Sequence, residues 1–164
     1  MSEYERFLDI IKTLRGEGGC PWDREQTHMS LKPGCIEEAA EVISGINILD
    51  KTGNPENLIE ELGDLLLQIV MHAQIASEEG LFSMDDVLRG ISEKMIRRHP
   101  HVFGNVNVAD SDEVLRNWAK IKEVEKSGKE WMDEYLPSAF EESKQLIDVA
   151  AKRKQEKLNA KKNS

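Results

Sequence analysis

The 164-residue sequence contains few aromatic residues, two cysteines and no long hydrophobic run. Aromatic side chains make up 5% of the chain, which disfavours a β-sheet protein because strands are rich in aromatic and β-branched residues. Two cysteines cannot form a disulfide framework, so we expect reduced thiols and a cytoplasmic protein. The apolar segments are too short to cross a bilayer, and the first residues lack the basic-then-apolar order of a secretory signal.

Charge is distributed unevenly along this acidic chain. The net charge is −9, but residues 152–164 carry six lysines and arginines against one acid, so the preceding 151 residues carry −14. A body that acidic repels nucleic acid, and we expect any phosphate to be bound locally with the help of a bridging cation. The basic tail either complements the dipole of a C-terminal helix or contacts an anionic partner.

The hydrophobic spacing predicts an all-α protein with short connections and no significant sheet. We expect helices over about residues 3–15, 33–50, 56–79, 83–99, 112–126 and 137–160, with loops over 16–28 and 101–111. The segment Val102–Val108 is the longest candidate strand, and it is weak. The predicted architecture is a bundle with a four-helix core of antiparallel helices. We expect one domain over residues 1–164, with a core over about 5–126 and a C-terminal helix over about 137–160.

The segment Leu58–Ala76 is the most informative part of the sequence. Twelve of its 19 residues are apolar and cover most of the circumference of a helix, which predicts a buried helix. Four polar residues nevertheless recur at steps of three and four and share one narrow stripe: Glu61, Asp64, Gln68 and His72. Carboxylates there need basic partners, a raised pKa or a metal ion to compensate them.

The preceding helix supplies further acids instead of cations. Glu38 and Glu41 are three residues apart and share a face, and the turn at 51–55 is short enough to make the two helices antiparallel neighbours. Four carboxylates could then converge, namely Glu38, Glu41, Glu61 and Asp64. Such a set favours Mg²⁺, which binds through a few carboxylates together with substrate phosphates. Glutamate-rich helices are also common as solvated faces, and this alternative stays open.

Several motifs resemble those of the MazG proteins, a group of all-α nucleoside triphosphate pyrophosphohydrolases. The resemblance covers roughly residues 5–150 in order and spacing. It rests on Glu37-Glu38-x-x-Glu41 with Glu61-x-x-Asp64, the stretches Gly19–His28 and Arg97–Phe103, Asn117-Trp118-x-x-Ile121-Lys122, and Leu136–Ala139. The chain has room for one MazG-like domain, whereas familiar members carry two in tandem.

This resemblance implies hydrolysis of nucleoside triphosphates to monophosphate and pyrophosphate, in a house-cleaning role for the nucleotide pool. It implies Mg²⁺ as cofactor, with Mn²⁺ as a substitute, and Glu38, Glu41, Glu61 and Asp64 as metal ligands. A catalytic carboxylate, Glu38 or Glu41, would accept the proton of the attacking water. A homodimer or larger homo-oligomer is expected, both from the family and from the apolar surface of Leu58–Ala76.

Fixed positive groups are also needed for a triphosphate. Lys94 and Arg98 lie four apart on one predicted helix face beside Arg97, and the matching family positions contact phosphates. Trp118 matches a family position near the nucleotide, and Lys122 follows one turn later. Alternatively, Lys94 pairs with helix acids, the arginines complement the helix end, and Trp118 packs in the core.

Two other classes of protein remain open at this point. One is a non-catalytic helical interaction module that docks through its basic C-terminal tail. The other is a carboxylate-bridged redox metal protein, for which Glu25-x-x-His28 supplies only half of the usual motif.

Overall fold

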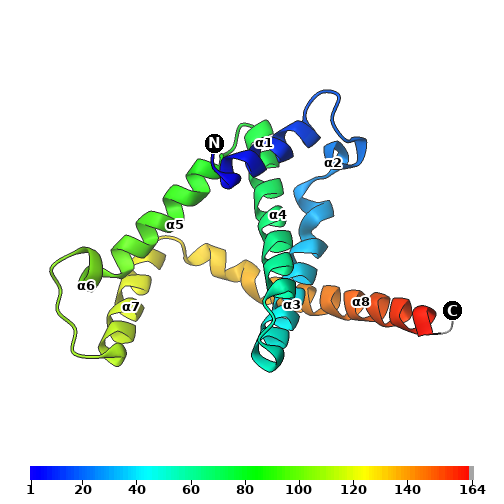
Figure 1. Cartoon of the computed structure of the whole chain (residues 1–164). Helices are drawn as coiled ribbons and strands as arrows, with labels where there is room; N and C mark the ends of the chain where they lie inside the picture. Colours follow the sequence, from blue (N-terminus) through cyan, green and yellow to red (C-terminus); the bar gives the residue numbers. More distant parts are fainter. Residues whose placement is uncertain (163–164) are drawn as a thin grey trace. The chain divides into compact units, whose positions relative to one another are not determined.

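The computed structural model describes residues 1–162 and contains no strand within that range. Its elements are α1 Glu3–Arg15, α2 Pro21–Glu25, α3 His28–Thr52, α4 Glu56–Glu78, α5 Met84–Arg98, α6 Pro100–Phe103, α7 Ser111–Lys126, the 3₁₀ helix η1 Glu130–Tyr135, and α8 Leu136–Lys162 (Figure 1). The predicted all-α class is therefore confirmed. Among the described residues, no helix combines the length and the apolar character that crossing a membrane requires.

The chain divides into two compact units. The first consists of Met1–Ser83 together with the part of α8 that starts at Phe140, and the second consists of Met84–Ala139. The first unit therefore holds α1 to α4 with most of α8, and the second holds α5 to α7 with η1. A single domain over the whole chain stays a prediction.

Helices α3 and α4 form the antiparallel pair that the short turn predicts, and they lie side by side along their length (Figure 1). Gly53 ends α3 in the left-handed conformation, with φ at 73°, which favours glycine. The helix backbones come close where Gly45 meets Leu58, since a Cβ on Gly45 would lie 2.9 Å from the Leu58 Cα. This contact fixes the register of the pair.

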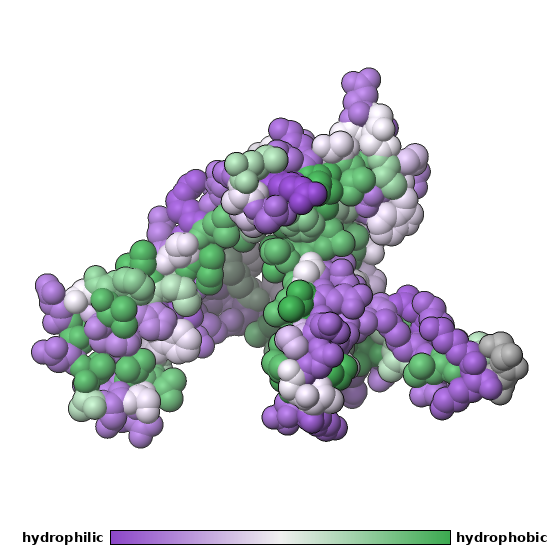
Figure 2. Space-filling model, viewed as in Figure 1, coloured by the Kyte–Doolittle hydropathy of each residue, from purple (hydrophilic) through white to green (hydrophobic). Residues whose placement is uncertain are grey.

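The core of the first unit lies around the C-terminal half of α4. Val70, Met71, Ala73, Ile75 and Ala76 are all buried there, next to Ile11 of α1 and Leu31 of α3. The N-terminal half is different, because Ile59 and Leu62 are 67% and 50% exposed. The prediction that Leu58–Ala76 is buried all round is therefore wrong for its first two turns in this chain. Figure 2 shows hydrophobic residues at the surface among the charged ones.

Three predicted boundaries also differ from the structure. Helix α3 begins at His28 instead of near Pro33, because Thr27 and Ser30 form a reciprocal capping box. Pro33 then removes only the hydrogen bond that its missing N–H would have donated to the carbonyl of Met29. The short helices α2 and α6 lie in segments predicted as loops, and each begins with a proline, whose fixed φ suits the first helical turn.

Arg15 holds the segment that connects α1 to α3 through hydrogen bonds. Its Nη1 donates to the carbonyls of Asp23, at 2.5 Å, and Gln26, at 3.1 Å, while Nη2 lies 2.7 Å from a Glu78 oxygen on α4. The hydrogen bond from Arg15 to Glu78 is the main reason that the pKa of Glu78 lies below its usual value. Since the Arg15 side chain is 6% exposed, this network fixes the segment that delivers His28 to the start of α3.

Candidate metal centre and anion-binding hollow

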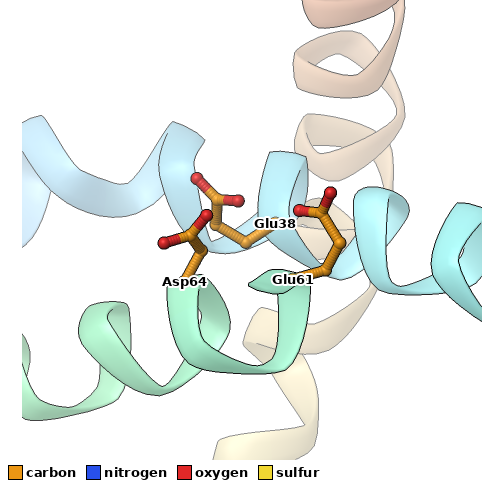
Figure 3. A group of neighbouring side chains, drawn as sticks. All are labelled: Glu38, Glu61 and Asp64. Atoms are coloured by element: carbon orange, nitrogen blue, oxygen red, sulfur yellow. The ribbon is translucent and has the colours of Figure 1, made fainter. Parts of the chain in front are cut away.

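Three carboxylates gather between α3 and α4, and we call Glu38, Glu61 and Asp64 the carboxylate triad. One oxygen from each lies within 4.8 Å of the others. Glu61 and Asp64 are one turn apart on α4, and Glu38 faces them from α3 (Figure 3). The predicted polar stripe of α4 therefore does meet the acidic helix before it.

The electrostatics of the triad are unfavourable without a cation. Burial, and then the negative charges of Glu41, Asp64, Glu37 and Glu61, raise the pKa of Glu38. Glu61 is only 8% exposed and accepts one hydrogen bond, from the Asn57 side chain at 2.8 Å. Within residues 1–162, no lysine or arginine pairs with any member of the triad. Basic partners therefore do not compensate the triad within the described residues, which leaves a raised pKa or a metal ion.

Glu41, the fourth predicted ligand, lies outside this group. Its Oε1 is 2.6 Å from Lys154 Nζ on α8. Its neighbour Glu37 pairs with Arg153 and lies 3.6 Å from the same lysine. The Arg153 hydrogen bond is the main reason that the pKa of Glu37 is lowered. The structure thus brings three of the four predicted metal ligands together, whereas the fourth, Glu41, forms an ion pair with Lys154.

The polar stripe continues along α4 beyond the triad. Gln68 fills the space beside Gly34, where a Cβ would lie 2.9 Å from its Oε1, and that buried oxygen has no hydrogen-bond partner among the described residues. One turn further, His72 Nδ1 lies 2.7 Å from His28 Nδ1, and His72 Nε2 lies 3.3 Å from Cys35 Sγ. Burial, and then the neighbouring His28, lower the pKa of His72, whereas burial raises the pKa of Cys35. These distances suit hydrogen bonds that link the Cys35 thiol to His72 and His72 to His28.

His28 and Cys35 were not expected to meet His72. They are seven residues apart and share a face of α3, but the predicted start of that helix near Pro33 left His28 in a loop. The signal that could have found the contact is the helical period continued backwards from Glu38 through Cys35 to His28. Glu25 ends α2 and His28 begins α3, so the half motif of a di-iron protein does not lie on one helix.

The second unit contains a basic hollow of about 500 Å³ between α5, α7 and the segment that follows. Six of its lining side chains are basic and two are acidic: Lys94, Arg97, Arg98, Lys122, Lys126 and Lys129, with Glu125 and Asp133. Four of the five residues predicted to bind substrate therefore line one cavity. Its excess of positive charge suits an anion such as a phosphate group.

Trp118, the fifth predicted substrate residue, packs beside this hollow instead of lining it. The Arg98 guanidinium lies 5.6 Å from the centre of the Trp118 ring, and the His99 ring lies 5.7 Å from it. Arg98 Nη2 donates to Glu125 at 2.6 Å, and Arg97 Nε donates to the same carboxylate at 2.7 Å. These bonds, that of Arg98 above all, lower the pKa of Glu125. Trp118 and Glu125 together hold Arg98 in one orientation.

The donor set of the triad decides which cation it could hold. All of its ligand atoms are carboxylate oxygens, which hard cations such as Mg²⁺ prefer, and there is no thiolate or imidazole in the group. Glu38 and Asp64 stay in contact with solvent, so a hydrated ion could enter. The residues present therefore fit Mg²⁺ or Mn²⁺ better than Zn²⁺.

Comparison with known proteins gives a consistent result. Residues 26–103, which include the whole triad, match the model of the MazG nucleotide pyrophosphohydrolase domain. The MazG nucleoside triphosphate pyrophosphohydrolase/pyrophosphatase of Thermotoga maritima is 48% identical over 126 residues, covering 77% of this chain. The nucleoside triphosphate pyrophosphohydrolase of Escherichia coli K12 is 45% identical over 130 residues, covering 79% of this chain. The uncharacterized protein YabN of Bacillus subtilis is 53% identical over 128 residues, covering 78% of this chain.

These relatives are longer than the chain. The matched region spans 46% of the Thermotoga protein, 48% of the Escherichia protein and 25% of YabN. The similarity therefore concerns one part of each relative.

Proposed function

Because residues 26–103 belong to the MazG nucleotide pyrophosphohydrolase family, we propose that this chain hydrolyses nucleoside triphosphates to monophosphate and pyrophosphate, using Mg²⁺ held by the carboxylate triad. The observation that carries the proposal is the convergence of Glu38, Glu61 and Asp64 without a basic partner in the described chain. The names of the Thermotoga and Escherichia relatives support the reaction class. The cytoplasmic location and the house-cleaning role stay predictions.

We assign different roles to the triad residues according to their surroundings. A magnesium ion bound there would neutralise charge on phosphate oxygens and lower the pKa of a bound water. Glu38 is the proposed acceptor of a proton from the attacking water, because it belongs to the triad and stays in contact with solvent. Asn57 fixes the Glu61 carboxylate through a hydrogen bond of 2.8 Å, which keeps it in a ligating orientation.

The basic hollow is the proposed binding place for the phosphate groups. Lys94 and Lys122 line it and form no ion pair within the described residues, so their ammonium groups are available to an anion. Arg98 is oriented by Glu125 and Trp118 and can present its remaining N–H groups to a phosphate oxygen. Arg97 shares Glu125 and is proposed as a weaker contact.

A direct assay separates this proposal from its competitors. Incubation of the purified chain with mixed nucleoside triphosphates and Mg²⁺ should release pyrophosphate and nucleoside monophosphate, with no orthophosphate formed first. Chelation of the metal should stop the reaction. Failure to turn over any triphosphate at any concentration of Mg²⁺ or Mn²⁺ would instead favour a non-catalytic interaction module. Optical absorption from bound iron would favour a redox protein.

We also propose that the chain forms a homodimer or a larger homo-oligomer. The support is the exposure of large apolar residues on α3 and α4, where Ile43 is 61%, Ile46 51% and Ile59 67% exposed. Monomeric proteins rarely leave such residues together at the surface. Sedimentation velocity at micromolar concentration should show an assembly, and a monomer under these conditions would contradict the proposal.

A further inference from the structure

Helix α8 lies against α3 through a series of ion pairs. Lys32 Nζ is 2.9 Å from a Glu142 oxygen, Arg153 pairs with Glu37, and Lys154 lies 2.6 Å from Glu41. The last two pairs involve the acidic motif that supplies Glu38 to the triad. The basic end of the chain thus touches the same helix turn as the proposed metal site.

The contact between these helices combines ion pairs with loose apolar packing, to which Ile36 of α3 and Ile147 of α8 contribute. No residue of α8 is fully buried within the described range. Small side chains, Ala40 of α3 with Ala150 and Ala151 of α8, face each other across a hollow of about 290 Å³. A helix attached through partly exposed ion pairs is held weakly, because water and salt compete for its charges. Such a helix can leave α3 without exposing a packed core.

The register of α3 and α4 indicates which residue of α4 lies opposite Glu41. Gly34 meets Gln68 on one side of the triad, and Gly45 meets Leu58 on the other. Because the helices are antiparallel, these two contacts place Glu41 across from Glu61. A change in the side-chain conformation of Glu41 is therefore the movement that would exchange Lys154 for an ion at the triad.

We propose that α8 is an autoinhibitory strap, in which Lys154 withholds Glu41 from the carboxylate triad and competes with the metal ion for it. The proposal rests on the metal site of the proposed function and adds its regulation. Lys154 or the ion neutralises Glu41, but not both, so the strap lowers metal affinity. By thermodynamic reciprocity, metal binding must loosen the strap to the same extent.

Metal binding to the full chain tests the strap directly. Titration with Mn²⁺, followed by electron paramagnetic resonance of the free ion, gives the affinity without any need for turnover. Lys154→Ala should bind Mn²⁺ about threefold or more tightly than the unmodified chain, the factor expected for the loss of one partly exposed ion pair. Lys154→Arg, which can keep the pair, should retain most of the lower affinity.

Lys152→Ala is the matched control, because it removes the same charge two residues earlier on α8 from a lysine without an ion pair on α3. Equal affinities in Lys152→Ala and Lys154→Ala would assign the effect to net charge and overturn the strap. Weaker binding by Lys154→Ala would overturn it as well, since the lysine would then position Glu41 for the metal.

Hydrogen exchange supplies a second readout. Addition of Mn²⁺ should reduce the amide protection of α8, and unchanged or increased protection would contradict the strap. Asp64→Asn separates the two proposals. If it abolishes Mn²⁺ binding while Lys154→Ala changes nothing, the metal site stands and the strap fails. If no variant and not even the unmodified chain binds Mn²⁺, both fail.

Discussion

Replacement of Asp64 by asparagine should abolish pyrophosphate release while the protein stays folded. The change preserves size and removes one of three converging oxygen donors, together with a full negative charge. Loss of a group that holds a catalytic ion should reduce turnover by about a thousandfold or more, the scale seen when a direct electrostatic stabiliser is removed. The measurement is the initial rate of pyrophosphate release at saturating Mg²⁺, with circular dichroism as the test of folding.

The same variant should be more stable than the unmodified chain when metal is absent. Repulsion within the triad contributes to the raised pKa of Glu38. When the pKa of a carboxyl group is higher in the folded than in the unfolded state, the folded protein loses stability as the pH rises from the unfolded-state pKa through the folded-state pKa. Asp64→Asn removes one repelling charge, so the melting temperature in a chelator should fall less between acidic and neutral pH. If Asp64 served only to hold the structure together, Asp64→Asn would instead be less stable than the unmodified chain.

Asp50→Asn is the control for charge, since Asp50 is an exposed acid near the end of α3, away from the triad residues of α4, and makes no ion pair among the described residues. It should leave both turnover and melting temperature nearly unchanged. Full activity in Asp64→Asn would remove the triad from the mechanism, whatever the family.

The part of the site that depends on helical period could be predicted from the sequence. Glu61 and Asp64 fall on one stripe of an otherwise apolar segment, and the short turn predicted at 51–55, observed at 53–55, brings the preceding helix back alongside it. These two facts are local, and together they bring Glu38 to the triad. The predicted resemblance to MazG is likewise confirmed, by the match of residues 26–103 to the model of that domain. It could be predicted because the motifs lie within short stretches of chain.

The partners of Glu41 and Arg98 could not be predicted in the same way. Lys154 is 113 residues from Glu41 in sequence, and its arrival depends on how α8 lies on α3. Glu125 is 27 residues from Arg98 and depends on the pairing of α5 with α7. Charge alone offers many equivalent pairings in a chain with 22 basic and 31 acidic residues. Only tertiary contacts select among them.

The predicted start of α3 was wrong because Pro33 is compatible with a helix that begins earlier. Pro33 disfavours a helix by removing one N–H, but the capping box of Thr27 and Ser30 satisfies the free groups of the first turn. The extra turn carries His28 to His72 and lengthens the polar stripe. The cap outweighs the single unfavourable residue, and the sequence spacing alone does not show that this cap is formed.

The substitution Gly45→Val should destabilise the first unit strongly, because Gly45 is where α3 and α4 touch. A Cβ at this position would lie 2.9 Å from the Leu58 Cα and 3.2 Å from its N, so the obstacle is backbone and cannot rotate away. Forced overpacking of this kind costs about 3 kcal/mol, at the upper end of the usual range. The free energy of unfolding, measured by urea titration with circular dichroism, should fall by that amount.

Gly63→Ala on α4 is the matched control, since a Cβ there meets nothing within 4 Å. Alanine is a better helix former, and this variant should gain about 0.5–1 kcal/mol. If Gly45→Val were as stable as the control, α3 and α4 would be able to separate at this contact. The triad, whose three oxygens come from both helices, would then have no fixed geometry. The stability of Gly45→Val therefore tests the physical basis of the metal site independently of any nucleotide.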